Sequence, residues 1–142
     1  MHELASRSLF DAQTKEMERI SRLRGWRLFT IQYPIIDVAL VSTKNFEIRV
    51  RMICDNWNDL PPSIELLSLT GEHLKNIEPN PGGVFNNSQH PTTNRPFICM
   101  IGSREYHTHS SHINDSWAKY KDVPGNDLGG ILTKIWRAWR KV

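Results

Sequence analysis

The chain has 142 residues, of which 39% are hydrophobic, which is enough for one compact core but hardly for two. Its net charge of +3 is too weakly basic to predict a nucleic-acid partner, and the one dense basic cluster, Arg137, Arg140 and Lys141, is of the kind that helix ends commonly carry. No apolar stretch approaches the length of a membrane-spanning helix, and the N-terminus lacks the order of a secretion signal. The two cysteines, Cys54 and Cys99, form no Cys-x-x-Cys pair. We therefore expect one cytoplasmic domain, residues 1–142, with no membrane partner.

The first half of the chain predicts a helix and then a sheet. Residues 3–24 have apolar side chains at spacings near 3.6, which indicates one opening helix, and Gly25 is placed to end it. Strands are expected at 26–33, 37–43, 46–54 and 64–69, separated by turn residues. The third strand has the alternation of an antiparallel strand with one wet face, and Cys54 falls in line with its buried side.

The second half predicts a long loop and further helices. Residues 71–96 are rich in Pro, Gly, Asn and Ser, so regular structure is not expected there, and long loops in compact domains are often functional. Asn114 or Asp115 is a candidate cap for a short helix through Trp117 and Tyr120. Residues 127–140 carry one broad apolar stripe that predicts a helix, with its Trp residues anchoring the core. This order of elements indicates an α+β fold.

The residues able to carry chemistry are concentrated in the segment 90–112. They are the potential zinc ligands Cys99, Glu105, His107, His109 and His112. In an extended 105–109 segment, Glu105, His107 and His109 project to the same side, and His112 returns across a short turn. An incidental cluster of surface His is the alternative, but unpaired burial of such groups costs several kcal/mol. We favour a metal or catalytic site, with zinc as the metal.

Cys99 itself has three interpretations. It is a metal ligand, a nucleophile that His107 or His112 activates as a base, or a small buried residue among apolar neighbours. A ligating thiolate is a poor nucleophile, so the first two exclude each other. Arg104 and Asp115 are expected to orient ligands or to form surface pairs.

Two groups of residues resemble motifs of the ubiquitin-conjugating (UBC-like) family. The run Trp57-Asn58-Asp59-Leu60-Pro61-Pro62 is similar to the family's Tyr-Pro-x-x-Pro-Pro turn. His90-Pro91-Thr92 and then Phe97-Ile98-Cys99-Met100 are similar to its His-Pro-Asn tripeptide and the thioester-forming Cys that follows. The resemblance implies a UBC-like fold, with an N-terminal helix, a four-stranded antiparallel meander and C-terminal helices, and it implies Cys99 and His90 as catalytic residues. Thr92 stands where the family has the Asn that supports the oxyanion, so the resemblance does not extend to conventional lysine conjugation.

The segment after Cys99 is similar to a bacterial group of predicted metal-binding proteins named for a Cys-Glu-His-His set. The similarity implies a metal site of Cys99, Glu105, His107 and His112, with His109 as a substitute. That group is found beside ubiquitin-like proteins, activating enzymes and JAB-type deconjugating peptidases. The implied role is therefore in a bacterial ubiquitin-like modification pathway active in phage defence, with the ubiquitin-like protein and its activating enzyme as partners.

Four functions remain as hypotheses. The first is a diverged UBC-like protein with the metal site just described. The second is an active thioester carrier with Cys99 as nucleophile. The third is a zinc-dependent hydrolase with Glu105 or Asp115 as base. The fourth is a non-enzymatic interaction module that uses the Trp-rich terminal helix or the 84–96 loop.

Overall fold

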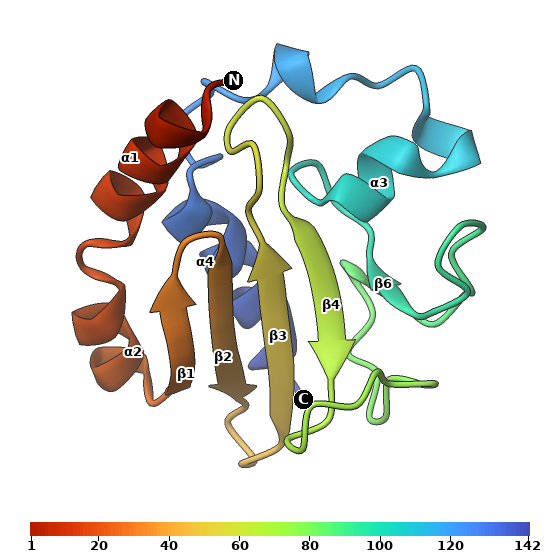
Figure 1. Cartoon of the computed structure of the whole chain (residues 1–142). Coiled ribbons are helices and arrows are strands. Elements are labelled where there is room, and N and C mark those ends of the chain that lie inside the picture. The colour runs from red at the N-terminus through yellow and green to blue at the C-terminus, as the bar shows by residue number, and fades with distance from the viewer.

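The computed structural model describes all residues, 1–142, and its centre is an antiparallel sheet of four strands (Figure 1). The strands follow one another in space as in sequence: β1 (Arg27–Gln32), β2 (Ile35–Val41), β3 (Glu47–Ile53) and β4 (Ser63–Leu67). Before them come α1 (Glu3–Thr14) and α2 (Met17–Arg24), and after them β5 (Phe85–Asn86), β6 (Phe97–Ile98), α3 (Arg104–Thr108), 3-10 turns at Ser110–His112 and Trp117–Lys119, and α4 (Leu128–Trp139). The predicted α+β class, with an N-terminal helix and a four-stranded meander, is confirmed.

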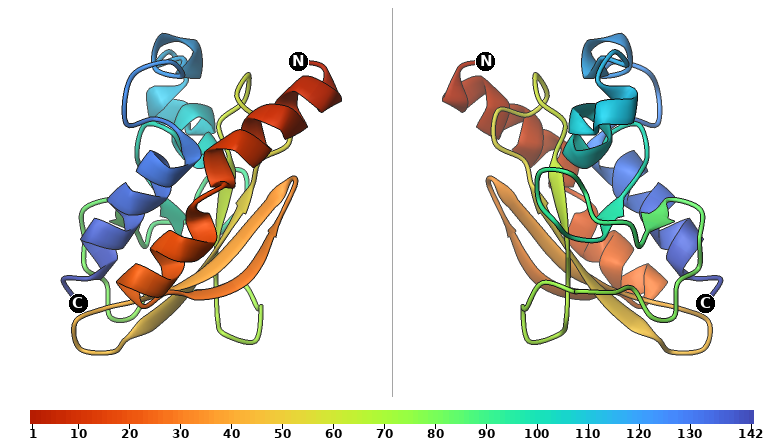
Figure 2. Two further views of the ribbon diagram at one scale, coloured as in Figure 1. Left: turned by 90° about the vertical axis from the view of Figure 1, so that its left-hand side faces the viewer. Right: turned by 90° about the vertical axis from the view of Figure 1, so that its right-hand side faces the viewer.

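The helices α1, α2 and α4 cover one face of the sheet (Figure 2). The sheet side chains on that face belong to a core cluster of 23 buried residues, which includes Phe10 of α1, Met17 of α2 and Trp139 of α4. Alternation in β3 is as predicted: Ile48, Val50 and Met52 are buried, and Cys54 beyond the strand is fully buried. The helices are thus held on the sheet by burial of one apolar face from each element.

The opening segment differs from the prediction of a single helix over 3–24. The helix is interrupted at Lys15 and Glu16, and α1 and α2 are separate helices. The Thr14 hydroxyl donates to the Phe10 carbonyl at 2.9 Å, the kind of side-chain bond that commonly accompanies a bend or a helix end. Spacing alone does not reveal this break, because Phe10 and Met17 on either side of it are both buried. Gly25 ends α2 as predicted, with φ of +72°.

The final helix agrees closely with the prediction. Asp127 precedes α4, and its carboxylate accepts from the Gly130 N–H at 2.8 Å. The apolar stripe is buried in the core, with Trp139 at 2% exposure and Trp136 partly buried against it. The segment 71–96 is largely irregular, as expected, apart from β5. None of the helices combines the length and hydropathy needed to cross a membrane.

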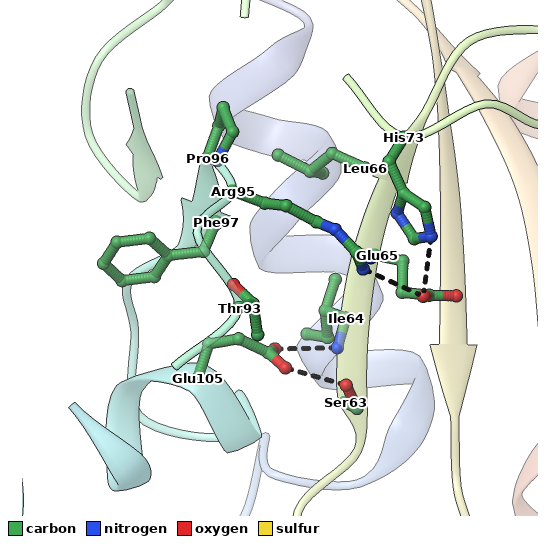
Figure 3. Close-up of a pocket in the computed structure, with 10 residues that line it drawn as sticks. All are labelled: Ser63, Ile64, Glu65, Leu66, His73, Thr93, Arg95, Pro96, Phe97 and Glu105. Carbon is green, nitrogen blue, oxygen red and sulfur yellow. Dashed lines mark hydrogen bonds and ion pairs between the residues drawn. The ribbon is translucent and has the colours of Figure 1, made fainter. Parts of the chain in front are cut away.

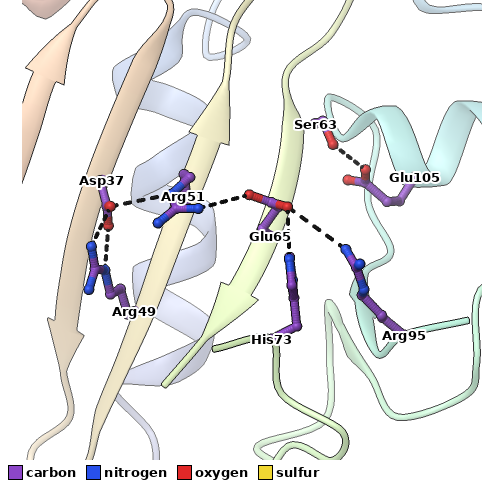
Figure 4. Close-up of polar contacts among 8 residues, drawn as sticks. All are labelled: Asp37, Arg49, Arg51, Ser63, Glu65, His73, Arg95 and Glu105. Carbon is purple, nitrogen blue, oxygen red and sulfur yellow. Dashed lines mark hydrogen bonds and ion pairs between the residues drawn. The ribbon is translucent and has the colours of Figure 1, made fainter. Parts of the chain in front are cut away.

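The outer face of the sheet carries a row of ion pairs instead of helices (Figure 4). Asp37 of β2, only 3% exposed, accepts from Arg49 at 2.7 Å, and Arg51 contacts both Asp37 and Glu65 of β4. The Arg49 bonds lower the pKa of Asp37 even though its burial acts the other way. Glu65 also contacts His73 and Arg95, so the row reaches past β4 to the segment that leads into β6.

Candidate active site around Cys99

Cys99 lies directly after β6 and is the more exposed of the two thiols. Its backbone N–H donates to the Val84 carbonyl at 2.7 Å, and its side chain is of intermediate exposure, whereas Cys54 is fully buried. Burial raises the pKa of the Cys99 thiol, and it raises the pKa of Cys54 much further. The protein therefore has one thiol that solvent can reach, and that thiol is largely protonated at neutral pH.

The turn that follows Cys99 is tightly fixed. The Ser103 hydroxyl donates to the Ile98 carbonyl at 2.6 Å, and so joins the two sides of the turn. Gly102 has φ of +102°, and a Cβ atom built there would lie 3.2 Å from Cγ1 of Ile131 in α4. The close approach of α4 and the positive φ both require glycine at this position. The backbone around the thiol is thus held by β6, by Ser103 and by the final helix.

The structure corrects the expectation that 105–109 is extended. Residues Arg104–Thr108 form α3, in which Ser103 is the N-cap and its hydroxyl accepts from the Tyr106 N–H at 3.1 Å. A helix turns successive side chains by about 100° each, so His107 points to another side than Glu105, and His109 lies beyond α3 as its C-cap in an extended conformation. The cap was the signal available in the sequence, because Ser followed by Arg-Glu is typical of a helix start.

Glu105 is buried and faces β4 (Figure 3). It is 7% exposed, and its two carboxylate oxygens accept from the Ser63 hydroxyl at 2.7 Å and from the Ile64 N–H at 2.8 Å. β4 has a sheet neighbour on one side only, so Glu105 satisfies a backbone donor on its free edge. Burial raises the pKa of Glu105, while these bonds oppose that shift.

A small polar cavity of about 50 Å³ lies beside this carboxylate (Figure 3). Its lining comes from β4 and from the 93–97 segment, including Thr93, Arg95 and Phe97. The volume is sufficient for a few water molecules but too small for an organic substrate.

His90 is buried at 1% exposure, and both of its ring nitrogens are used by the protein. Nδ1 accepts from the Thr92 N–H at 3.1 Å, so Nε2 carries the proton and donates to the Glu105 carbonyl at 2.9 Å. His90 thus joins the turn of residues 90–95 to α3, and it has no bond to Cys99. His90, which was predicted to be catalytic, therefore holds the turn of residues 90–95 against α3 in this structure.

His107 is similarly occupied. Nε2 accepts from the Gly102 N–H at 3.1 Å, so the proton resides on Nδ1, which donates to the Asp115 carbonyl at 2.7 Å. Burial lowers the pKa of His107, which favours this neutral form. The ring connects the turn after Cys99 to the 110–115 segment.

Within the segment 90–112, His109 and His112 are the histidines that have ring nitrogens without a protein partner. His109 accepts from Ser111 at Nδ1, leaving Nε2 without a protein partner. The His112 ring stacks on Tyr106 with centroids 4.1 Å apart, and it lies 6.0 Å from the His109 ring.

The predicted zinc ligands do not fit a metal in this arrangement. Both oxygens of Glu105 and both ring nitrogens of His107 are bonded to the protein, and no three His, Cys, Asp or Glu side chains converge on one point. Zinc coordination by Cys99, Glu105, His107 and His112 would require α3 to detach from β4 and from Gly102. The zinc site stays a prediction.

The Asp115 carboxylate and two tyrosines complete the site. The sequence indicated Asp115 as a candidate but did not predict its bonds to the tyrosines. Asp115 accepts from the Tyr106 and Tyr120 hydroxyls, both at 2.6 Å. The bond to Asp115 is the main cause that raises the pKa of Tyr106 to about 12, and the charge of Cys99 is a minor one. Asp115 was expected to cap a helix, to orient ligands or to form a surface pair. Ser116 caps the Trp117–Lys119 turn instead, and Asp115 pairs with Lys119 at 3.8 Å.

Arg104 forms the surface pair that was one of its two expected roles. Its guanidinium donates to Asp55 at 2.9 Å and to the Pro61 carbonyl at 3.1 Å. Arg104 therefore ties α3 to the turn of residues 55–62, the segment that resembles the family's Pro-rich turn.

Comparison with known proteins gives a match to the second half of the chain. Residues 83–141 match the family model described as Y4jH-like, Y4jH family, and this segment contains Cys99, α3 and α4. An uncharacterized protein y4jH of Sinorhizobium fredii (strain NBRC 101917 / NGR234) is 42% identical over 41 residues. That alignment covers 29% of this chain and 20% of the relative, so the chain matches only about a fifth of that protein's length. Neither description states an activity.

Proposed function

We propose that this chain is a diverged UBC-like protein of a bacterial ubiquitin-like modification pathway, in which Cys99 carries an acyl group as a thioester. The observation that supports the proposal is the partly exposed position of the Cys99 thiol on a rigid backbone. It is the reachable thiol, on a backbone fixed by Val84 and Ser103, after a turn that the buried His90 ties to α3. The order of helix, four-stranded meander, His90 turn and Cys99 supports the UBC-like assignment.

The chemistry follows from a thiol with a raised pKa and no base bonded to it. Such a thiol reacts slowly with unactivated carbonyls, so the acyl donor must itself be activated. In the proposed step, the Cys99 sulfur attacks the thioester carbonyl that joins the C-terminus of a ubiquitin-like protein to the cysteine of its activating enzyme. A new C–S bond forms at Cys99, the old C–S bond breaks, and the activating enzyme leaves as the thiolate, which takes up the proton that Cys99 loses.

The onward transfer differs from that of conventional conjugating enzymes. Thr92 is exposed, and its backbone N–H is used by His90. Since no amide side chain stands at this position to support an oxyanion, we propose a carrier whose acyl group passes to a partner or is removed by a JAB-type peptidase.

The proposal is tested with a synthetic probe that does not depend on knowing the partner. A peptide ending in Gly-Gly, prepared as an alkyl thioester, is incubated with the full chain, and acylation is located by mass spectrometry under non-reducing conditions. We expect the acyl group on Cys99, its release by thiol reductant, and no acylation of Cys99→Ala.

The matched control is Cys54→Ala, which removes the buried thiol and should acylate normally. Equal acylation of Cys54 and Cys99 in the native protein, or none on Cys99, would contradict the carrier function. Metal analysis of the same sample separates the alternatives: near-stoichiometric zinc with Cys99 protected until chelation would favour the metal protein. The physiological test then uses the ubiquitin-like protein and activating enzyme with ATP.

A further inference from the structure

A second feature lies at the end of α4, away from Cys99, where cations gather without acidic partners. After the cap residue Asp127 the sequence to Val142 contains no acidic side chain, while Arg137, Arg140 and Lys141 are exposed. None of these three forms an ion pair, with a side chain or with the terminal carboxylate. Cations at a helix C-terminus favour the helix dipole, but that end carries only about half a charge, and like charges three and four residues apart repel.

Contacts from α2 and from the β2–β3 turn fix this cluster in place. Arg24 of α2 donates to the Thr133 hydroxyl at 2.8 Å, and its guanidinium lies 4.6 Å from the ring centre of Trp136. Arg140 lies 4.7 Å from the same ring, so Trp136 holds two guanidinium groups. Thr43 ties the turn to the helix end, because its hydroxyl donates to the Arg140 carbonyl at 3.1 Å.

An open hollow of about 530 Å³ lies at this point, lined by Thr43, Arg137, Arg140 and Lys141. No hydrophobic side chain and no carboxylate lines it. The pKa of Arg24 is lowered by burial and then by the charge of Arg137, which agrees with a region of net positive potential. An anion would relieve this repulsion, and the guanidinium donors fit phosphate oxygens.

We propose that this basic patch, formed by Thr43, Arg137, Arg140 and Lys141 with Arg24 beside it, binds the phosphate backbone of a nucleic acid. An acidic protein surface is the other polyanion to weigh. Protein interfaces are apolar at their centre, whereas interfaces with nucleic acid are polar and positively charged. The hollow has no apolar lining residue, so the phosphate backbone is the better match.

The test measures binding of a fluorescein-labelled single strand of about 20 nucleotides, a length that exceeds the usual site size. DNA and RNA strands of mixed sequence are compared by fluorescence anisotropy, with poly-glutamate of similar length as competitor. Contact with three to four phosphates predicts that affinity falls about 20- to 50-fold between about 50 and 200 mM salt. We expect Arg137→Ser, Arg140→Ser and Lys141→Ser, combined, to reduce the slope of log affinity against log salt by about 2.

A matched variant controls for net charge. Lys15, Arg19 and Lys75 are exposed cations on other parts of the chain, and their combined replacement by Ser removes the same charge. The near-ultraviolet circular dichroism of the Trp residues checks that both variants remain folded. Binding that is lost only in the patch variant supports the proposal. No binding at low salt, equal weakening in both variants, or displacement by poly-glutamate at equal charge concentration would overturn it. The last outcome would indicate an acidic protein partner.

Discussion

The bonds of Glu105 predict that this residue stabilises the fold through the free edge of β4. Glu105→Ala removes the acceptor for the Ser63 hydroxyl and leaves the buried Ile64 N–H without a partner. A hydrogen bond to a charged group contributes about 1.5–3 kcal/mol, and an unsatisfied buried donor costs about 1–3 kcal/mol. We expect the free energy of unfolding to fall by about 3–5 kcal/mol, which corresponds to a decrease in Tm of about 10–15 °C for a chain of this length.

Glu105→Gln is the matched variant, because it keeps the size of the side chain and its hydrogen bonds but removes the charge. The amide oxygen can accept from Ile64, and the rotating Ser63 hydroxyl can accept from the amide nitrogen, so we expect a loss of less than about 1 kcal/mol near neutral pH. The pKa of Glu105 in the folded chain is raised above its ordinary value of 4.5. Ionisation of this buried carboxyl therefore costs the folded chain more than the unfolded chain, so the pH-dependent part of its contribution to stability is full below that value and is lost as pH rises through the folded-state pKa, while the hydrogen bonds to Ser63 and Ile64 remain. The stability of the Gln variant relative to the native chain should increase with pH over that interval.

Urea unfolding followed by Trp fluorescence, at several pH values from 4 to 8, measures all three proteins. An unfolding free energy for Glu105→Ala equal to that of the native chain would refute the assigned role of the carboxylate. A second result would also refute it: the Gln variant as unstable as the Ala variant, with loss of bound zinc in both. Glu105 would then act as a metal ligand, because an amide replaces a carboxylate poorly at zinc.

Three further predictions concern the turn after β6 and its surroundings. N-ethylmaleimide should modify Cys99 and spare Cys54 in the folded chain, and the rate should still increase above pH 8 because burial raises the pKa of the Cys99 thiol. Peptide mass spectrometry measures the labelling of each cysteine, and equal labelling of Cys99 and Cys54 would contradict this. Gly102→Ala should cost about 1–3 kcal/mol more in urea unfolding than Gly125→Ala, since both have positive φ but only Gly102 has a side chain of α4 close by; equal losses would remove the packing argument. Absorbance at 295 nm should lose a titration near pH 12 in Tyr106→Phe, while Tyr120, whose pKa is also raised by its bond to Asp115, continues to titrate; an unchanged titration curve in that variant would refute the assignment.

The sequence by itself predicted the strands and the final helix of this protein accurately. The four predicted strands agree with the observed ones to within two residues at each end, and the alternation in β3 correctly buried Cys54. α4 was predicted over residues 127–140, and Gly25 was correctly placed to end the opening helical segment. These features depend on local periodicity and on capping chemistry, which neighbouring residues specify without long-range information.

The candidate site was predicted only in part from the sequence. The sequence located the chemically relevant segment and the candidate thiol Cys99, because His, Cys and Glu residues at short spacing stand out in a chain. It did not show that Glu105 is taken by β4, which lies about forty residues earlier, or that His107 is bonded to Gly102 and Asp115. Which side chains remain free to react depends on the competition among hydrogen-bond partners in the folded chain, and only the tertiary structure brings those partners together.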